Sequence, residues 1–151
     1  MRCRLCHQER RLRKSHVFPE WLYKPLYDGR HNFSVLSTDP TKKRGTRPIG
    51  IYDRLLCDEC ERRLAQWEGY GRYVFHRMPV NPTENDRSFV FSGVHYGPFK
   101  LFQMSLLWRA SLTSRPELHR VDLGPHSERM RTMLLDGRPG EPHECGAILM
   151  L

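Results

Sequence analysis

The sequence predicts an α+β fold in which a first half with short strands is followed by a mainly helical second half. Three brief runs before residue 57 have the composition of strands, and the apolar patterns after it have the spacing of helices. Two C-x-x-C pairs, Cys3 with Cys6 and Cys57 with Cys60, flank the part with strands. We therefore expect the first half to close around a metal ion, with the later helices packed on it.

The cysteine spacing predicts one tetrahedral Zn²⁺ site. Two intervening residues let both thiolates of a pair face the same way, and four thiolates are a common ligand set for structural zinc. An iron–sulfur site or unligated thiols are the alternatives, and His7, beside Cys6, could replace one cysteine. The fifth cysteine, Cys145, is far from both pairs and is expected to be a buried apolar thiol.

One domain is the simplest organisation for 151 residues. A polar stretch over 79–87 is the plausible division between a zinc-bound module, residues 1–78, and a hairpin with helices, residues 88–151. Only 38% of the residues are hydrophobic, so a metal would supplement a modest core. The apolar C-terminal run ends at Leu151 as if an element were cut, which predicts a longer natural chain.

Membrane and secretory signals are missing from the sequence. No stretch reaches the roughly 18 apolar residues that a membrane-spanning helix needs. The charged N-terminal residues have no apolar segment behind them. We therefore expect a soluble cytoplasmic protein whose thiols stay reduced, which favours metal ligation over disulfides.

Positive charge is concentrated in the first half of the chain. The net charge is +8, and residues 1–63 contain 15 Lys or Arg against 8 Asp or Glu, whereas residues 64–151 contain 10 against 9. A basic surface around one module is typical of proteins that bind nucleic acid, because each neutralised phosphate releases counterions. A generally arginine-rich composition is the alternative explanation.

Short strands are expected between the cysteine pairs. They cover residues 16–18, 33–36 and 49–56. Pro19 ends the first of them and begins a short helix, which Pro25 limits. A polar loop over 38–48 is rich in Lys, Arg, Gly and Thr, and it is either solvated or lies on a phosphate backbone.

Helices are expected after the second cysteine pair. Asp58 should cap a helix that runs to about residue 76 and bends or stops at Gly69 and Gly71. A hairpin is expected from residues 88–91 and 94–96. The helix that follows Pro98 is apolar on most sides and is the expected core helix. A last helix is expected from Ser127 to Gly137.

The order of these motifs resembles the zinc-bearing form of the HNH endonuclease family. The chain reads C-x-x-C, then Ser15-His16-x-x-Pro19, then L-C-x-x-C followed at once by Glu61. The family has Asp-His-x-x-Pro and an Asn or His after the last cysteine. The resemblance covers roughly residues 3–68 and implies a treble-clef, ββα-metal unit. It also implies DNA as the expected substrate, with RNA as the alternative, in a setting such as bacterial or phage defence.

The resemblance also implies roles for single residues. Cys3, Cys6, Cys57 and Cys60 match the structural zinc ligands. His16 matches the histidine that activates water, and Glu61 matches a ligand of the catalytic metal. Ser15 stands where the family has a metal-binding Asp, and the family's middle Asn is missing, with Asp53 as the nearest substitute.

The residues also support such chemistry by themselves. Phosphodiester hydrolysis needs a base for the attacking water and a cation near the leaving oxygen. His16 titrates near neutral pH, and a Glu61 carboxylate in the first turn of a helix suits Mg²⁺ or Mn²⁺. Glu68 lies seven residues further on the same face and could be a second carboxylate. Alternatively His16 is a structural residue, Glu61 stabilises the helix N-terminus, and Glu68 is solvated.

Arg109 is the unusual residue of the core helix. A buried guanidinium without a partner is costly, so it is expected to pair with Glu61 or Glu68 near a scissile phosphate, or to extend to the surface. The sequence thus favours a metal-dependent nuclease. The alternative is an inactive zinc module that binds nucleic acid or protein. Binding to another protein or to a second copy of the chain is a further possibility that the sequence leaves open.

Overall fold

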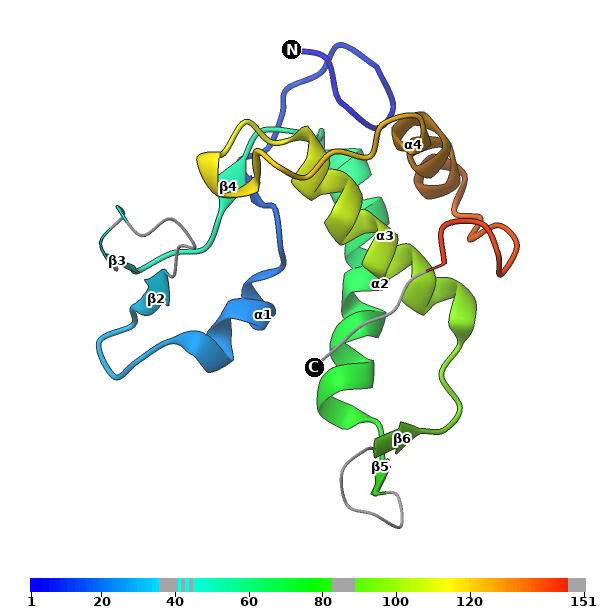
Figure 1. Cartoon of the computed structure of the whole chain (residues 1–151). Coiled ribbons are helices and arrows are strands. Elements are labelled where there is room, and N and C mark those ends of the chain that lie inside the picture. The colour runs from blue at the N-terminus through cyan, green and yellow to red at the C-terminus, as the bar shows by residue number, and fades with distance from the viewer. Residues whose placement is uncertain (36–40, 42, 44, 83–88, 147–151) are drawn as a thin grey trace.

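Two helices, α2 and α3, pack together at the centre of the fold, and the other elements surround them (Figure 1). The computed structural model describes residues 1–35, 41, 43, 45–82 and 89–146. In chain order the elements are β1 (Ser15–His16), α1 (Glu20–Tyr23), the 3₁₀ turn η1 (Lys24–Leu26), β2 (Phe33–Val35), β3 (Gly45–Arg47), β4 (Tyr52–Asp53), α2 (Asp58–Arg77), β5 (Val80–Pro82), β6 (Phe89–Phe91), α3 (Tyr96–Leu112), η2 (Pro116–Leu118) and α4 (His126–Asp136). The α+β class expected from the sequence is confirmed.

The N-terminal segment lies antiparallel to the chain that leads into α2. β1 pairs with β4, with His16 opposite Tyr52. Further toward the N-terminus the amide of Arg13 donates to the carbonyl of Leu56 at 2.9 Å, and Leu12 forms a bridge with Cys57. This pairing carries the first cysteine pair to the start of α2.

Helix α2 differs from the sequence-based expectation in its N-cap residue and in its length. Cys57, not Asp58, is its N-cap residue, because the bridge to Leu12 holds Cys57 extended while Asp58 already has helical geometry. The helix also continues through both glycines to Arg77. A Cβ at Gly71 would lie 2.7 Å from the ring of Phe102 on α3, so this glycine is needed for helix contact and does not end the helix.

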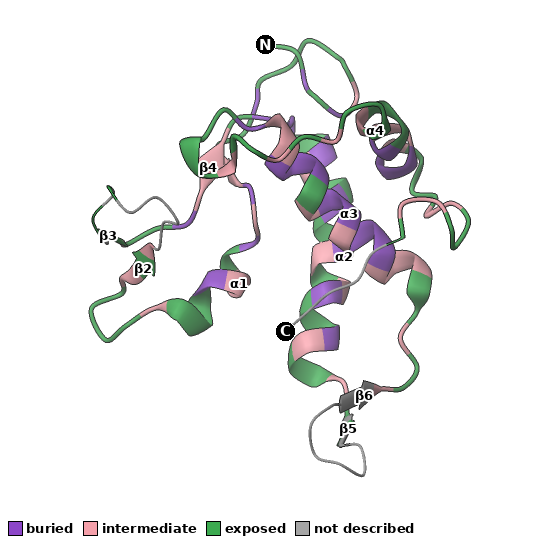
Figure 2. Ribbon diagram, in the orientation of Figure 1, coloured by how far each residue is buried: buried purple, intermediate pink, exposed green. Residues whose placement is uncertain are grey.

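Helix α3 is the core helix, as its all-round apolar pattern predicted. Its inner side chains include Phe102, Met104 and Trp108, which are at most 2% exposed, and Figure 2 shows the buried surface concentrated where α3 meets α2. The core also includes Leu5, Leu56 and Leu64 from the first half. Within the described ranges, no helix combines the length and the apolar composition that crossing a membrane requires.

Helix α4 ends where the sequence predicted and links the second half to the metal unit. Gly137 follows it with a left-handed φ of 68° and closes its C-terminus. The guanidinium of Arg131 donates to the carbonyl of Leu5 at 2.6 Å, between the two N-terminal cysteines. On α3, the buried ammonium of Lys100 donates to the carbonyl of Glu141 at 2.8 Å and fixes the chain after α4.

The hairpin expected over 88–96 is wrong, because its first strand pairs with a different segment. β6 pairs with β5, which precedes it, and residue 96 begins α3. Pro98 in the first turn of α3 is compatible with a helix because its missing N–H would have no partner there. β2 lies within the strand expected over 33–36 and pairs with β3, which lies inside the expected polar loop over 38–48. Residue 36 of that strand and residues 38–40, 42 and 44 of the loop lie outside the described ranges.

Candidate metal centre and adjoining cavity

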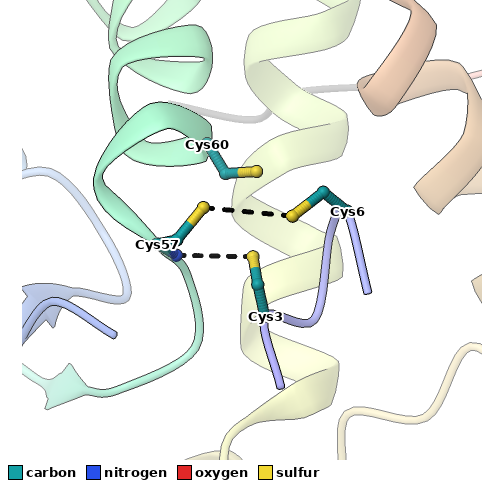
Figure 3. Close-up of side chains that lie close together, drawn as sticks. All are labelled: Cys3, Cys6, Cys57 and Cys60. Atoms are coloured by element: carbon teal, nitrogen blue, oxygen red, sulfur yellow. Dashed lines mark hydrogen bonds between the residues drawn. The ribbon is translucent and has the colours of Figure 1, made fainter. Parts of the chain in front are cut away.

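The four paired cysteines meet in one buried cluster. Their sulfur atoms all lie within 4.8 Å of one another. Figure 3 shows Cys57 and Cys60 at the start of α2 facing Cys3 and Cys6 of the N-terminal loop. The Sγ atoms of Cys6 and Cys57 are 3.9 Å apart, close to the roughly 3.8 Å that two ligands of a tetrahedral zinc with bonds of about 2.3 Å would have.

The environment of the cluster supports thiolate ligands. Burial raises the pKa of the Cys3 thiol, but backbone N–H donors from Cys6, Cys57 and Leu5 outweigh it and bring this pKa down to about 7. Burial and the neighbouring thiols raise the pKa of Cys60. Burial also raises the pKa of Cys6, so Cys3 ionises more readily than a free thiol while Cys6 and Cys60 resist ionisation. A bound divalent cation would favour the thiolate form of all four cysteines.

The donor set of four cysteine sulfur atoms is compatible with zinc. Four sulfur ligands from two C-x-x-C turns are typical of structural zinc sites. Within the described parts of the chain, this is the only group of three or more Cys, His, Asp or Glu side chains close enough to hold a metal ion by themselves. Cys145 is not part of it and is half-buried against the core, so its expected full burial is wrong.

The cysteine cluster holds together two segments that border a cavity of about 330 Å³. From Leu12, bridged to the second cysteine pair, the chain continues directly to His16 on β1. Glu61 lies one residue after Cys60 in the first turn of α2. Residues from β1, α1, β4, α2 and α3 line the cavity: Lys14, Ser15, His16, Pro19, Glu20, Trp21, Lys24, Tyr52, Glu61, Glu68, Arg72 and Arg109. All four proposed catalytic residues are among them.

The imidazole of His16 is held against aromatic rings at the cavity wall. Its centroid lies 3.9 Å from that of Tyr52, the residue paired with it across the β1–β4 ladder. Burial lowers the pKa of His16, while the carboxylates of Glu20 and Glu68 oppose this shift and Arg109 adds to it. The ring is therefore mostly neutral at pH 7, the state in which it can accept a proton.

The carboxyl group of Glu61 is half-buried near Ser15. Burial raises its pKa, which the nearby Ser15 hydroxyl and the charge of Arg109 partly offset. Ser15, which stands where the resemblance would place a metal-binding Asp, thus lies close to the Glu61 carboxylate. Glu61 thus combines a fixed position with an environment that would favour a nearby cation.

Glu68 and Arg109 form a partly buried ion pair. The guanidinium of Arg109 is 3% exposed and binds the Glu68 carboxylate, whose side chain is 21% exposed. The same guanidinium donates to the backbone carbonyl of His16 at 3.1 Å. Arg109 therefore does not extend to the surface, and Glu68 is a partner of Arg109 and not a freely solvated side chain.

Asp53 does not take the place of the family's missing Asn. Its carboxylate accepts a hydrogen bond from the hydroxyl of Thr113 and another from the amide of Arg54 at 2.7 Å, and it does not line the cavity. These hydrogen bonds outweigh its burial and lower its pKa. Asp53 is thus a structural link between β4 and the end of α3.

Three cations at the cavity were not singled out from the sequence. They are Lys14 beside β1, Lys24 after α1 and Arg72 on α2. Arg72 lies four residues after Glu68 and eleven after Glu61, so helical spacing from the two glutamates could have indicated it. The two lysines gave no comparable signal. The position of Lys14 depends on the pairing of β1 with β4, and that of Lys24 depends on how α1 packs against α2 through Trp21.

No match to this chain was found among protein-family models, curated proteins or solved structures. The resemblance to the HNH family thus depends on its cysteine, histidine and proline spacing over residues 3–68. What the structure adds is the geometry: two cysteine pairs in one cluster, and a cavity beside them that gathers one histidine, three carboxylates and several cations.

Proposed function

We propose that this protein is a metal-dependent nuclease of HNH type that hydrolyses phosphodiester bonds in DNA or RNA. One observation carries the proposal: His16 and Glu61, from separate segments tied together by the cysteine cluster, line the same cavity. Cations also border this cavity, and they favour an anionic substrate such as a phosphodiester.

His16 is the general base in this proposal. Its neutral ring nitrogen takes a proton from water, and the resulting hydroxide attacks phosphorus while the bond to the leaving oxygen breaks. Arg109 is a positioning residue, because it holds the carbonyl of His16 and neutralises Glu68. Glu61 would hold Mg²⁺ or Mn²⁺ together with substrate oxygens, and such an ion supplies positive charge for the leaving oxygen.

A plasmid-nicking assay with Mg²⁺ or Mn²⁺ tests this function. We expect wild type to nick, and His16→Ala and Glu61→Ala to lose about 100-fold or more of the rate. Glu59→Ala is the matched control, since Glu59 lies in the same helical turn but is exposed and pairs with Arg10. Equal nicking by all chains, or none on any DNA or RNA substrate, would refute the proposal.

A second candidate is a zinc module that binds nucleic acid without cutting it. The observation that favours it is the ion pair of Glu68 with Arg109, which occupies one of the cavity's three carboxylates. In that case no chain nicks, yet wild type binds labelled DNA with an affinity that falls as salt rises.

A further inference from the structure

A groove beside the His16 cavity has the composition of a binding site for a flexible polyanion. It encloses about 570 Å³ and is lined by Trp21, Lys24, Gly69, Arg72, Tyr73, His76 and Arg77. Trp21, Lys24 and Arg72 line both hollows, so the groove adjoins the cavity. Whatever occupies the cavity can therefore extend into the groove.

Within the part of the chain that the structure describes, the groove is lined by cations without acidic partners. No acidic residue is among those that line it, in contrast to the cavity with its three glutamates. Lys24, Arg72 and Arg77 have no ion-pair partner within the described residues. Arg72 and Arg77 lie about 7.5 Å apart along α2, since five residues of helix rise roughly 1.5 Å each. Separate phosphates can thus contact separate cations.

A second hollow shares Lys14 and Tyr52 with the cavity, and most of its cations are engaged. Arg47 pairs with Glu117, and the guanidinium of Arg115 donates to the carbonyl of Tyr52 at 2.7 Å. Lys14, 5.4 Å from the centroid of the Tyr52 ring, has no ion-pair partner within the described residues. The groove along α2 therefore offers more cations to a ligand.

Aromatic rings in the groove favour unpaired bases over a duplex. Tyr73 is 48% exposed on α2, and the ring of Trp21 is fixed by an edge contact with His76 at 5.5 Å. Exposed rings next to cations are the usual platform for single strands, because every unpaired base offers a face for stacking. In a duplex those faces are already covered by neighbouring base pairs.

We propose that this groove binds single-stranded nucleic acid next to the position where the cavity holds a phosphodiester. The inference rests on the proposed function for its choice of ligand. Lys24, Arg72 and Arg77 contact the phosphates, and Tyr73 stacks on a base. Among these residues Tyr73 and Arg77 line the groove but not the His16 cavity, so they separate binding from cleavage.

Fluorescence polarisation with labelled oligothymidine of about 20 nucleotides tests the groove. The full-length zinc-loaded His16→Ala chain is the parent, so that the probe stays intact. We expect Tyr73→Ala to weaken binding by about 10-fold. Arg77→Ala should reduce the slope of log affinity against log salt by about 0.7, the value for one phosphate of a single strand.

Gly69→Glu blocks the same groove and has a matched control. An added Cβ at Gly69 meets no atom within 4 Å, and the same is true of Gly29, which lies away from the groove. We expect Gly69→Glu to weaken binding of the oligothymidine at least 10-fold. Gly29→Glu, and Arg120→Ala as a control for loss of an exposed cation, should bind as the parent does.

The outcomes separate this inference from the proposed function. The groove is not a binding site if Gly69→Glu, Tyr73→Ala and Arg77→Ala all bind the probe with the affinity and salt slope of the parent. This holds even where His16-dependent nicking is observed. A duplex of the same length that binds as tightly, without loss in Tyr73→Ala, would overturn its preference for single strands. Weaker binding in the three variants, with no nicking by any chain, would support the groove and refute the nuclease.

Discussion

His16 is a residue whose protonation the fold controls. Its imidazole lies against Tyr52, and its pKa is lowered below 6.5 mainly by burial. Above about pH 6.5 the ring is neutral in both the folded and the unfolded chain, so it adds no pH dependence to stability. Below that pH the unfolded chain binds the proton first, and the folded state is therefore destabilised as the pH falls toward the folded pKa.

We expect this effect to be visible in urea unfolding. Between about pH 6.5 and about pH 5, wild type should lose more free energy of unfolding than His16→Gln does. The cysteine cluster and the carboxylates are the same in both chains, so the difference between the two curves reports His16. Parallel curves over this range would show that burial of the ring does not disfavour its charged form.

Arg109 shows how one buried charge can connect two halves of a chain. It is on α3, yet it binds Glu68 on α2 and the backbone of β1. Truncating one partner of such a pair leaves the other charge poorly solvated. This contact is the link between the core helix and the residue proposed as the base.

Arg109→Met should accordingly destabilise the chain by about 3 kcal/mol in denaturant unfolding. Arg109→Met combined with Glu68→Gln should recover part of that loss, because the uncompensated carboxylate is removed. Arg120→Met is the control, since an exposed arginine at the surface should cost less than about 0.5 kcal/mol. Additive effects of Arg109→Met and Glu68→Gln would argue against a coupled pair.

At the level of elements, the contact between α2 and α3 depends on one glycine of α2. Gly71 faces Phe102 so closely that a Cβ would lie 2.7 Å from its ring, whereas a Cβ at Gly69 would meet nothing within 4 Å. Both glycines are in the interior of the same helix, where alanine is preferred by about 1 kcal/mol. The two positions thus share a backbone effect and differ in packing.

We expect Gly69→Ala to raise the free energy of unfolding by up to about 1 kcal/mol and Gly71→Ala to lower it by about 1 to 2 kcal/mol. The second value is the cost of displacing the Phe102 ring minus the gain in helix propensity. Urea unfolding of both variants measures the difference directly. Equal stabilisation by the two substitutions would show that α2 and α3 do not pack this closely.

The same elements show how far local sequence determines this fold. The C-x-x-C spacing predicted the cluster, and capping and periodicity predicted α1, α3 and α4. The hairpin over 88–96 was wrong because β6 pairs with the preceding β5, and because Tyr96 begins α3, whose packing on α2 stabilises a helix there. The role of Gly71 was not predictable either, since only the position of Phe102 shows why the helix continues.

For the site, the sequence predicted residue types better than partners. Helical spacing placed Glu61 and Glu68 on one face, and the cost of a buried guanidinium predicted a partner for Arg109. Only the structure shows that Arg109 binds Glu68 and not Glu61, and that the Ser15 hydroxyl lies close to the Glu61 carboxylate. Lys24 could not be assigned, because its approach to α2 is set by tertiary contacts of α1.

At the scale of the whole molecule, the cysteine cluster joins the N-terminal segment to the central helices. It couples residues 3–6 to the start of α2, and Arg131 of α4 binds the carbonyl between those cysteines. The core of the first half is small, so the metal is expected to supply much of its stability. Loss of zinc should therefore loosen the cavity as well as the N-terminus.

Chelation should expose this dependence. We expect a zinc chelator to lower the unfolding midpoint strongly and to abolish binding or cleavage of nucleic acid, because His16 and Glu61 are no longer held together. Added zinc should restore both properties. Unchanged thermal unfolding after complete removal of zinc would show that the fold does not need the metal.

Metal content of the purified chain tests the central claim most directly, since both candidate functions depend on the cysteine cluster. We expect elemental analysis to find about one zinc per chain in wild type and in Cys145→Ser, and far less in Cys60→Ser. Wild-type protein that contains no zinc, contains iron in its place, or keeps its zinc in Cys60→Ser would contradict the account.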